Sequence, residues 1–320
     1  MTWNCISVLA ALLTSAIAIG PVASAGPHPG ALTGNLHNGL AVRSQRVRPD
    51  TAHPNYEWID VRIEGGHWVS LWGINDSRVA SGAYIDDQGG THSFWWANGQ
   101  IFQVPDYPGA LHTSVSTIDN LGRLFGNWGS EEVQHAGYYD LATHRWTPLP
   151  DIPGYPINIG ARMTESGRAT GWACYGTFSN SFSCTGWVWN GEGYEMLGTE
   201  SAFPFGISNS GEVVGYDSAL RGFVYNKGVR HDLLDVNGEQ LVALVFSVNN
   251  QGAILVNGGF EPTNSNWVPA ILYKGSQTVL PRPSVLATFY QGMNERGDLV
   301  GLWYDDPAFT DFFGLIAFRK

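Results

Sequence analysis

The sequence is poor in charged side chains, and above all in lysine. Charged residues make up 14% of the 320 residues, well below the usual share of about a quarter, and lysine occurs three times. The formal net charge is -11, and no run of basic residues offsets it. A surface of this kind does not attract phosphate backbones or anionic lipid headgroups. We therefore expect neither nucleic acid nor a membrane surface among its partners.

Cysteine is also scarce, with three in the chain. Cys5 lies within residues 1–25, an uncharged apolar stretch that ends in Ala-Ser-Ala and is typical of a cleaved signal peptide. A membrane anchor is the alternative, but Ser15 and the Gly20-Pro21 pair interrupt the run, which is too short to span a bilayer. We expect the mature protein to be secreted or to remain in the secretory pathway, without membrane anchoring after cleavage.

Removal of the signal leaves two cysteines, Cys174 and Cys184. An even number in an oxidising compartment predicts one disulfide, which here would close a short loop. The mature chain also contains one Asn-x-Ser sequon, at Asn75, which makes this residue a candidate for glycosylation.

Several motifs that mark catalytic and cofactor sites are missing. The chain has no G-x-S-x-G elbow, no H-E-x-x-H, no phosphate-binding glycine loop, no EF-hand and no Asp-box. The sequence therefore gives no reason to expect a metal or a nucleotide cofactor, and we predict none.

What the sequence does contain is a repeat. Six segments share an apolar residue, a polar turn with glycine, and a short strand that ends in a second glycine in most copies. Their starts are spaced by 44, 45, 44, 41 and 45 residues: INDSRVASG from Ile74, IDNLGRLFG from Ile118, MTESGRATG from Met163, ISNSGEVVG from Ile207, VNNQGAILV from Val248 and MNERGDLVG from Met293. A period of 40 to 50 residues is typical of β-propeller blades.

Each repeat continues into further short strands, so that four antiparallel strands, A to D, are expected per repeat. The pattern predicts an all-β, six-bladed β-propeller. Glycine suits the turn between strands A and B because it adopts a left-handed conformation without a Cβ clash. In the first repeat Arg78 takes this position, which costs about 1 kcal/mol.

The last repeat lacks a strand D, and the segment YEWIDV at residues 56–61 has the pattern of one. We expect this N-terminal strand to complete the last blade and close the ring. The alternative, an open solenoid, would expose two sheet edges. The propeller thus spans residues 56–320, and residues 26–55, which are polar and rich in glycine and proline, form a flexible lead-in.

The apolar-Asn-x-x-Gly-x-apolar-apolar-Gly unit, followed by a Gly-aromatic strand, resembles the HAF-type extracellular repeat. The triplet that names this family is only approximated, by HSF at His92 and HAG at His135. The resemblance covers nearly the whole mature chain and implies secretion and a propeller fold, but no activity. In length, signal and abundance of tryptophan, the chain is also similar to the fungal propeller hetero-Diels–Alderases of tropolone–sesquiterpenoid pathways. That similarity implies the joining of a reactive quinone methide to a macrocyclic terpene.

The loops between strands B and C vary, whereas the A-to-B turns are nearly uniform, so we expect the site at the end that carries the B-to-C and D-to-A connections. His67 and His112 begin strand A in neighbouring repeats, and Asp305 lies in the last B-to-C loop. These are the candidate catalytic residues, because histidine and carboxylate side chains exchange protons. The candidate substrate-binding residues share this end or the strands leading to it: Trp68, Trp72, Tyr107, Tyr155, Tyr175, Arg221 and Trp303.

Roles outside catalysis and substrate binding remain alternatives for these residues. The histidines could be ordinary hydrogen-bonded loop residues, and the pairs Asp86-Asp87 and Asp305-Asp306 could be solvated, hold calcium or act as acid and base. Our first functional hypothesis is a monomeric enzyme that cyclises an apolar polyketide or terpenoid by a hetero-Diels–Alder reaction. The alternatives are an extracellular carbohydrate-binding or polysaccharide-cleaving propeller, and a non-catalytic interaction module.

Overall fold

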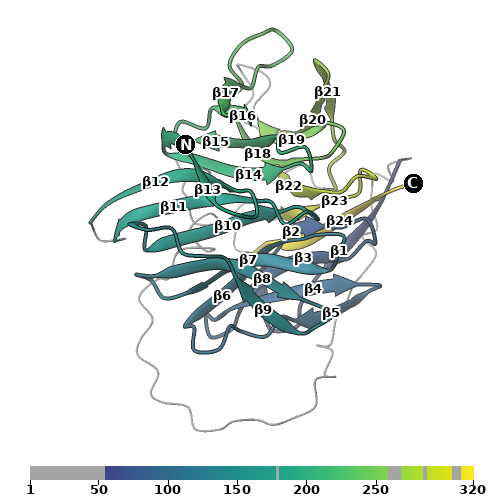
Figure 1. Cartoon of the computed structure of the whole chain (residues 1–320). Coiled ribbons are helices and arrows are strands. Elements are labelled where there is room, and N and C mark those ends of the chain that lie inside the picture. Colours follow the sequence, from purple (N-terminus) through teal and green to yellow (C-terminus); the bar gives the residue numbers. More distant parts are fainter. Residues whose placement is uncertain (1–54, 178–179, 259–267, 284–286, 305–310) are drawn as a thin grey trace. The chain divides into compact units, whose positions relative to one another are not determined.

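The computed structural model describes residues 55–177, 180–258, 268–283, 287–304 and 311–320 (Figure 1). The ordered elements in these ranges are strands, as the repeat predicted. Within the same ranges, no helix has the length and apolar character needed to cross a bilayer.

Four sheets contain four strands each, and none of them shares a strand ladder with another sheet. Their strands are β2 (Gly66–Ile74), β3 (Ala80–Asp86), β4 (Thr91–Ala97) and β5 (Gln100–Gln103); β14 (Ala202–Ile207), β15 (Val213–Asp217), β16 (Gly222–Asn226) and β17 (Val229–Asp232); β18 (Ala243–Val248), β19 (Ile254–Gly258), β20 (Val268–Tyr273) and β21 (Ser276–Val279); and β22 (Ala287–Met293), β23 (Leu299–Tyr304), β24 (Phe313–Arg319) and β1 (Tyr56–Val61). Within each sheet, neighbouring strands run antiparallel.

The second and third repeats form one sheet of eight strands. Its strands are β6 (His112–Ile118), β7 (Arg123–Gly129), β8 (Gln134–Asp140), β9 (Arg145–Pro148), β10 (Ile157–Met163), β11 (Ala169–Thr177), β12 (Asn180–Trp189) and β13 (Tyr194–Glu200). The two halves meet where Gln134 of β8 pairs in parallel with Ile157 of β10, and the Gln134 N–H donates to the Pro156 carbonyl at 3.0 Å.

The prediction of six separate blades is therefore wrong. Four separate four-stranded blades lie in the ring, and the eight-stranded sheet takes the place of further independent blades. The sequence period locates strands from side-chain pattern, but it does not report a main-chain bond between neighbouring repeats. The prediction of four-stranded antiparallel units holds for the other sheets.

Contacts between inner strands close the ring. β2 contacts β22, β23 and β24 on one side and β6 on the other, β10 contacts β14, and β18 contacts both β14 and β22. As expected, β1 pairs antiparallel with β24, from Tyr56 opposite Arg319 to Val61 opposite Gly314 (Figure 1). The two ends of the described chain thus complete one sheet.

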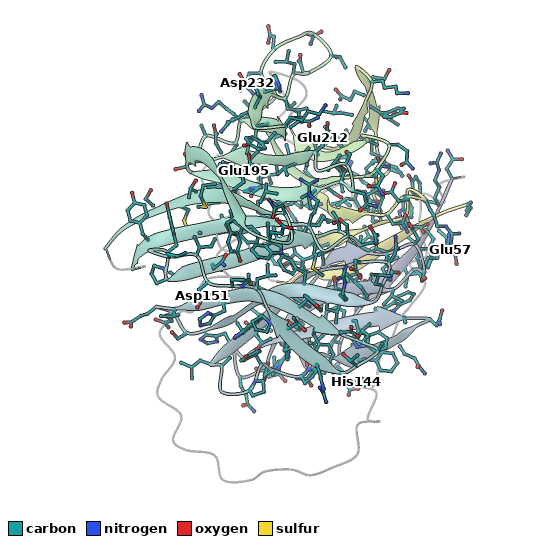
Figure 2. The ribbon with its side chains drawn as sticks, viewed as in Figure 1. Glu57, His144, Asp151, Glu195, Glu212 and Asp232 are labelled. Atoms are coloured by element: carbon teal, nitrogen blue, oxygen red, sulfur yellow. A yellow bond between two sulfur atoms is a disulfide. The ribbon has the colours of Figure 1, made fainter. Side chains whose placement is uncertain are left out.

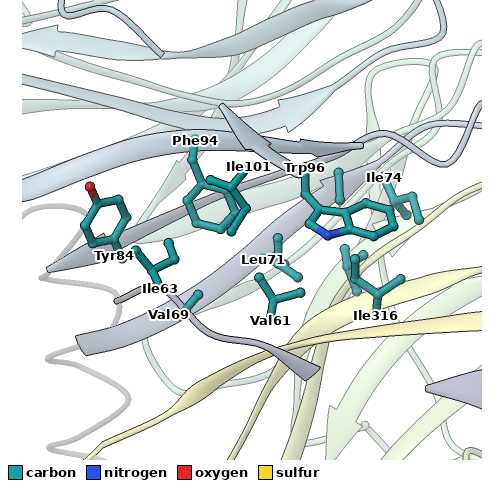
Figure 3. Packing of buried hydrophobic residues seen from close by; sticks show 12 residues of the cluster. Val61, Ile63, Val69, Leu71, Ile74, Tyr84, Phe94, Trp96, Ile101 and Ile316 are labelled. Carbon is teal, nitrogen blue, oxygen red and sulfur yellow. The ribbon is translucent and has the colours of Figure 1, made fainter. Parts of the chain in front are cut away.

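The apolar core lies between the faces of neighbouring sheets. One cluster unites Val61 of β1, Leu71 of β2, Phe94 and Trp96 of β4 and Ile316 of β24 (Figure 3). Each of these side chains is buried. Because strands buried on both faces present apolar residues to both neighbours, the abundance of aromatic residues is largely explained by this packing.

Two local expectations are met. Cys174 and Cys184 are bonded to each other and lie opposite one another on β11 and β12. Disulfides of this kind are usual in exported proteins. Arg78 adopts a left-handed conformation (φ 62°) where other repeats have glycine. Its guanidinium donates to both carboxylate oxygens of buried Asp298, at 3.1 and 3.2 Å, which offsets the cost of this conformation.

Candidate active site at the loop end of the ring

The start of β2 places His67 between two carboxylates from distant parts of the chain. Its Nε2 lies 2.8 Å from Oδ1 of Asp87, in the β3–β4 loop, and its Nδ1 lies 3.4 Å from Oδ2 of Asp311, just before β24. The His67 side chain is half exposed, so that a ligand can reach it.

These carboxylates change the acid–base behaviour of the ring. The hydrogen bond to Asp87, followed by that to Asp311, raises the pKa of His67 above the value usual for histidine. His67 therefore keeps its proton to a higher pH than an isolated histidine, and the ring is suited to donate a proton near neutral pH.

Asp311 also fixes the backbone beside His67. Its Oδ1 accepts the N–H of Trp68 at 2.7 Å, and the Val69 N–H donates to the Phe312 carbonyl at 3.1 Å. Trp68 has a left-handed conformation (φ 54°), and its ring lies 5.2 Å from that of Phe312. Such a conformation persists only where surrounding contacts hold it, and here Asp311 and Phe312 supply them.

A second carboxylate–histidine pair adjoins the first. Asp86 Oδ2 lies 2.8 Å from His92 Nε2, and His92 Nδ1 lies 3.3 Å from the side-chain nitrogen of Gln103. The bond to His92 holds the pKa of Asp86 below its usual value. The adjacent residues Asp86 and Asp87 thus contact different histidines.

An apolar strip crosses the loop end of the eight-stranded sheet. We define it as Leu111, Val133, Tyr155 and Tyr175; the side chains of Leu111, Val133 and Tyr175 are 75%, 42% and 46% exposed. Main-chain bonds link the segments that carry these residues. The Leu111 N–H donates to the carbonyl of Gly129, and Gln134, which follows Val133, pairs with Ile157 of β10. The rings of Tyr155 and Tyr175 are 6.0 Å apart. His112 follows Leu111 at the start of β6, beside this strip.

An aromatic stack lies near the strip. The ring of Tyr107 stacks on that of Trp128 with centroids 4.2 Å apart, and Trp146 lies 5.3 Å from Trp128. His135 Nδ1 contacts Asp151 Oδ1 at 2.6 Å, and Asp151 projects from the β9–β10 connection (Figure 2). The sequence expectation included Tyr107 but not Trp128, although the position of Trp128 at the end of a strand, before a variable loop, was a usable signal.

The remaining predicted residues lie apart from His67. Trp72 is half-buried at a β-bulge near the other end of β2, and Arg221 donates to Asp217 at 2.9 Å in the β15–β16 loop. Trp303 is buried in the core, where its Nε1 donates to Asp60 at 3.2 Å. Asp305 lies outside the described residues.

Asn75, the candidate for glycosylation, is buried. Its Nδ2, the atom that would carry a sugar, donates to the carbonyl of Asp119 at 3.0 Å, and its Oδ1 accepts the N–H of Val79 at 2.9 Å. In the folded chain the amide is therefore engaged in the turn. Within the described ranges, no group of three or more histidine, cysteine, aspartate or glutamate residues is arranged to hold a metal ion.

No known family profile matches the chain, and no curated protein matches its sequence. Solved structures do resemble it in fold. A gluconolactonase from Xanthomonas campestris is 11% identical and aligns over 89% of this chain and 99% of its own, with a TM-score of 0.48. The β-propeller domain of the trilobed protease from Pyrococcus furiosus is 9% identical over 83% and 86%, with a TM-score of 0.46. A lectin from Aleuria aurantia is 10% identical over 79% and 96%, with a TM-score of 0.46. All three are β-propeller proteins, and at these levels the likeness concerns the fold alone.

Proposed function

We propose that this protein is an enzyme of the secretory pathway that cyclises an apolar polyketide or terpenoid intermediate by a (hetero-)Diels–Alder reaction. One observation carries the proposal: a histidine held between two carboxylates lies at the end of the ring that also bears the apolar strip. This combination offers a proton donor and an apolar binding surface together.

The chemistry needs one assisted step. Protonated His67 donates its Nε2 proton to the hydroxyl of a hydroxymethyl phenol, the carbon–oxygen bond breaks, water leaves, and the phenol proton passes to solvent, which gives a quinone methide. Asp87 stabilises the imidazolium before the transfer, and Asp311 keeps the ring in place. The quinone methide then adds to an alkene without further proton transfer.

The apolar strip supplies the second contribution. Two reactants held side by side lose their translational freedom on binding rather than in the transition state. This can lower the activation barrier by up to about 7–11 kcal/mol for a well-aligned pair. The exposed faces of Leu111, Val133 and Tyr175 offer such a surface to an apolar ring system.

The test uses an ortho-(hydroxymethyl)phenol and a macrocyclic sesquiterpene olefin as reactants, with adduct formation followed by liquid chromatography and mass spectrometry. We expect adduct above the buffer background, and a loss of roughly 100-fold in rate for His67→Gln. The matched control is His144→Gln, because His144 lies in the β8–β9 turn away from this end (Figure 2). Equal rates for wild type, His67→Gln and buffer would rule the proposal out.

The Tyr107–Trp128 stack favours a second candidate, binding of a carbohydrate. Sugar rings pack on aromatic faces while carboxylates such as Asp151, whose side chain is well exposed, bond their hydroxyls. A glycan array with the wild type, Tyr107→Ala and the control Tyr273→Ala tests it. Binding that is lost in Tyr107→Ala alone would support the carbohydrate function, whereas an array without signal would eliminate it.

A further inference from the structure

The opposite end of the ring, which carries the A-to-B turns, contains a central cavity of ≈ 60 Å³. We call its outer lining the rim, with one residue from each repeat: Asp76, Asn120, Glu165, Asn209, Asn250 and Glu295. Below the rim lies an apolar collar, again with one residue from each repeat: Ile74, Ile118, Met163, Ile207, Val248 and Met293. The collar side chains are buried.

The rim residues bond to each other from turn to turn. Asn120 Nδ2 donates to Asp76 Oδ2 at 2.9 Å and to Glu165 Oε1 at 2.8 Å. The Asn250 N–H donates to Glu295 Oε1 at 2.9 Å, and the Glu295 N–H donates to Asp76 Oδ1 at 3.0 Å. The rim carboxylates therefore have donors within the protein and need no ligand to satisfy them.

Arg162 differs from every other residue at its position in the repeat. The five equivalent residues are small: Gly73, Thr117, Gly206, Ser247 and Gly292. Arg162 lines the cavity, its Nε is fully enclosed, and this atom has no hydrogen-bond partner among the described residues. The hydroxyl of Thr117, which also lines the cavity, is likewise enclosed and unpartnered within the described chain.

The enclosed Nε of Arg162 is a charged donor that faces the cavity without an acceptor, and an anion in the cavity would satisfy it, because arginine carries donors only and cannot neutralise itself. Burial lowers the pKa of Arg162 to about 10, while the Glu295 carboxylate opposes the change, so the side chain stays charged at neutral pH. The cavity has room for a few waters or one small ion, since one water needs roughly 10–15 Å³.

We propose that the central cavity binds one small monovalent anion, a halide or a carboxylate no larger than acetate, on the guanidinium of Arg162. The apolar collar excludes larger hydrated ions. The rim admits the anion past three carboxylates, which makes binding sensitive to their charge.

Binding should strengthen as the pH falls. Burial raises the pKa of Glu295, and the carboxylates of Asp76 and Glu165 raise it further. Protonation of Glu295 removes one negative charge from the rim, so anion binding is coupled to the uptake of a proton by Glu295. Other charged groups also lie at this end. Asp119 lines the cavity, and burial raises the pKa of its carboxyl. Arg123 is bonded to Asp119, and Arg296 donates to the Asp76 carbonyl.

The first experiment uses the wild-type mature protein. Crystals soaked in sodium bromide are measured at the bromine edge, and parallel soaks contain sodium formate or acetate. We expect an anomalous peak beside the Arg162 guanidinium, reduced when formate or acetate competes. Displacement by formate or acetate identifies a site open to carboxylates, whereas retention of bromide identifies a halide site. Ordered water alone, with no anomalous peak, would overturn the proposal.

The second experiment measures affinity in solution, by chloride-35 NMR line broadening at pH 5 and pH 8. We expect broadening to be at least about tenfold weaker in Arg162→Met, since a charge-assisted bond is lost, and to be largely retained in Arg162→Lys. The matched control is Arg168→Met, because Arg168 also has an enclosed, unpartnered Nε but does not line the cavity. Affinity that is equal at both pH values, or equal in Arg162→Met and Arg168→Met, would contradict the proposal.

Discussion

The strand β1 should be essential to stability, although it lies far in sequence from the sheet that it completes. β1 pairs with β24 over its whole length, with Trp58 opposite Ala317 and Val61 opposite Gly314. The Trp58 side chain is 5% exposed and that of Val61 is fully buried. Removing β1 would expose this core and leave β24 as an open sheet edge.

The size of the effect follows from the buried side chains. Loss of a buried tryptophan costs about 3–5 kcal/mol and loss of a buried valine about 1.5–3 kcal/mol, hence about 5–8 kcal/mol for both. This is a large share of the roughly 5–15 kcal/mol by which folded proteins are stable. A chain that begins at Tyr56 should therefore keep its fold, whereas a chain that begins at Arg62 should be mostly unfolded at 37 °C.

Guanidinium unfolding, followed by tryptophan fluorescence and by circular dichroism, measures both truncations. Within the intact chain, Trp58→Ala should lower the free energy of unfolding by about 3–5 kcal/mol. The exposed neighbour Glu57 serves as the control, and Glu57→Gln should change it by no more than about 0.5 kcal/mol. If the chain that begins at Arg62 unfolds at the same midpoint as the chain that begins at Tyr56, the role given to β1 is refuted.

Three further predictions concern single residues. His67→Gln should abolish the fall in rate that wild type shows as pH rises through the raised pKa of His67, and a pH–rate profile that is unchanged in the variant would contradict the role of proton donor. Arg78→Gly relieves a left-handed conformation that costs about 1 kcal/mol, but it leaves buried Asp298 without its guanidinium partner, which costs about 3 kcal/mol. Urea unfolding should therefore show a net loss of stability, and a stabilised variant would show that the conformational cost exceeds the value of the ion pair. Cys174→Ser should lower the free energy of unfolding by about 2–3 kcal/mol, the same loss that dithiothreitol causes in wild type; unequal losses would show an effect beyond the disulfide.

The repeat made much of the fold predictable because each of its signals is local. Glycine after a polar pair forces a tight turn, and Gly122 and Gly167 have the left-handed conformation that this requires, with φ values of 80° and 82°. The closing role of residues 56–61 followed from a missing strand. The number of separate sheets was not predictable, because the bond that joins the second and third repeats is made by the backbone at Gln134 and leaves no side-chain signature.

The candidate site was predictable only in part, for a different reason. The sequence pointed to the loop end and to His67, since a histidine at a strand entry among variable loops is conspicuous. It gave no sign that Asp311, 244 residues away, would contact that ring, because ring closure alone brings the two together. Trp303 shows the opposite failure, since its indole faces Asp60 on the strand that arrives from the N-terminus and is buried by it.

Arg162 indicates how such sites can be found in a repeat protein. Where six copies of a unit surround one axis, equivalent residues meet there, and the shared pattern serves packing: five small residues let the inner strands approach each other closely. A Cβ atom added to Gly73 would lie 2.6 Å from the backbone of Thr117, and a Cβ atom added to Gly292 would lie 2.6 Å from the carbonyl oxygen of Trp72. A long charged side chain at this position does not serve that packing, so its presence needs another cause.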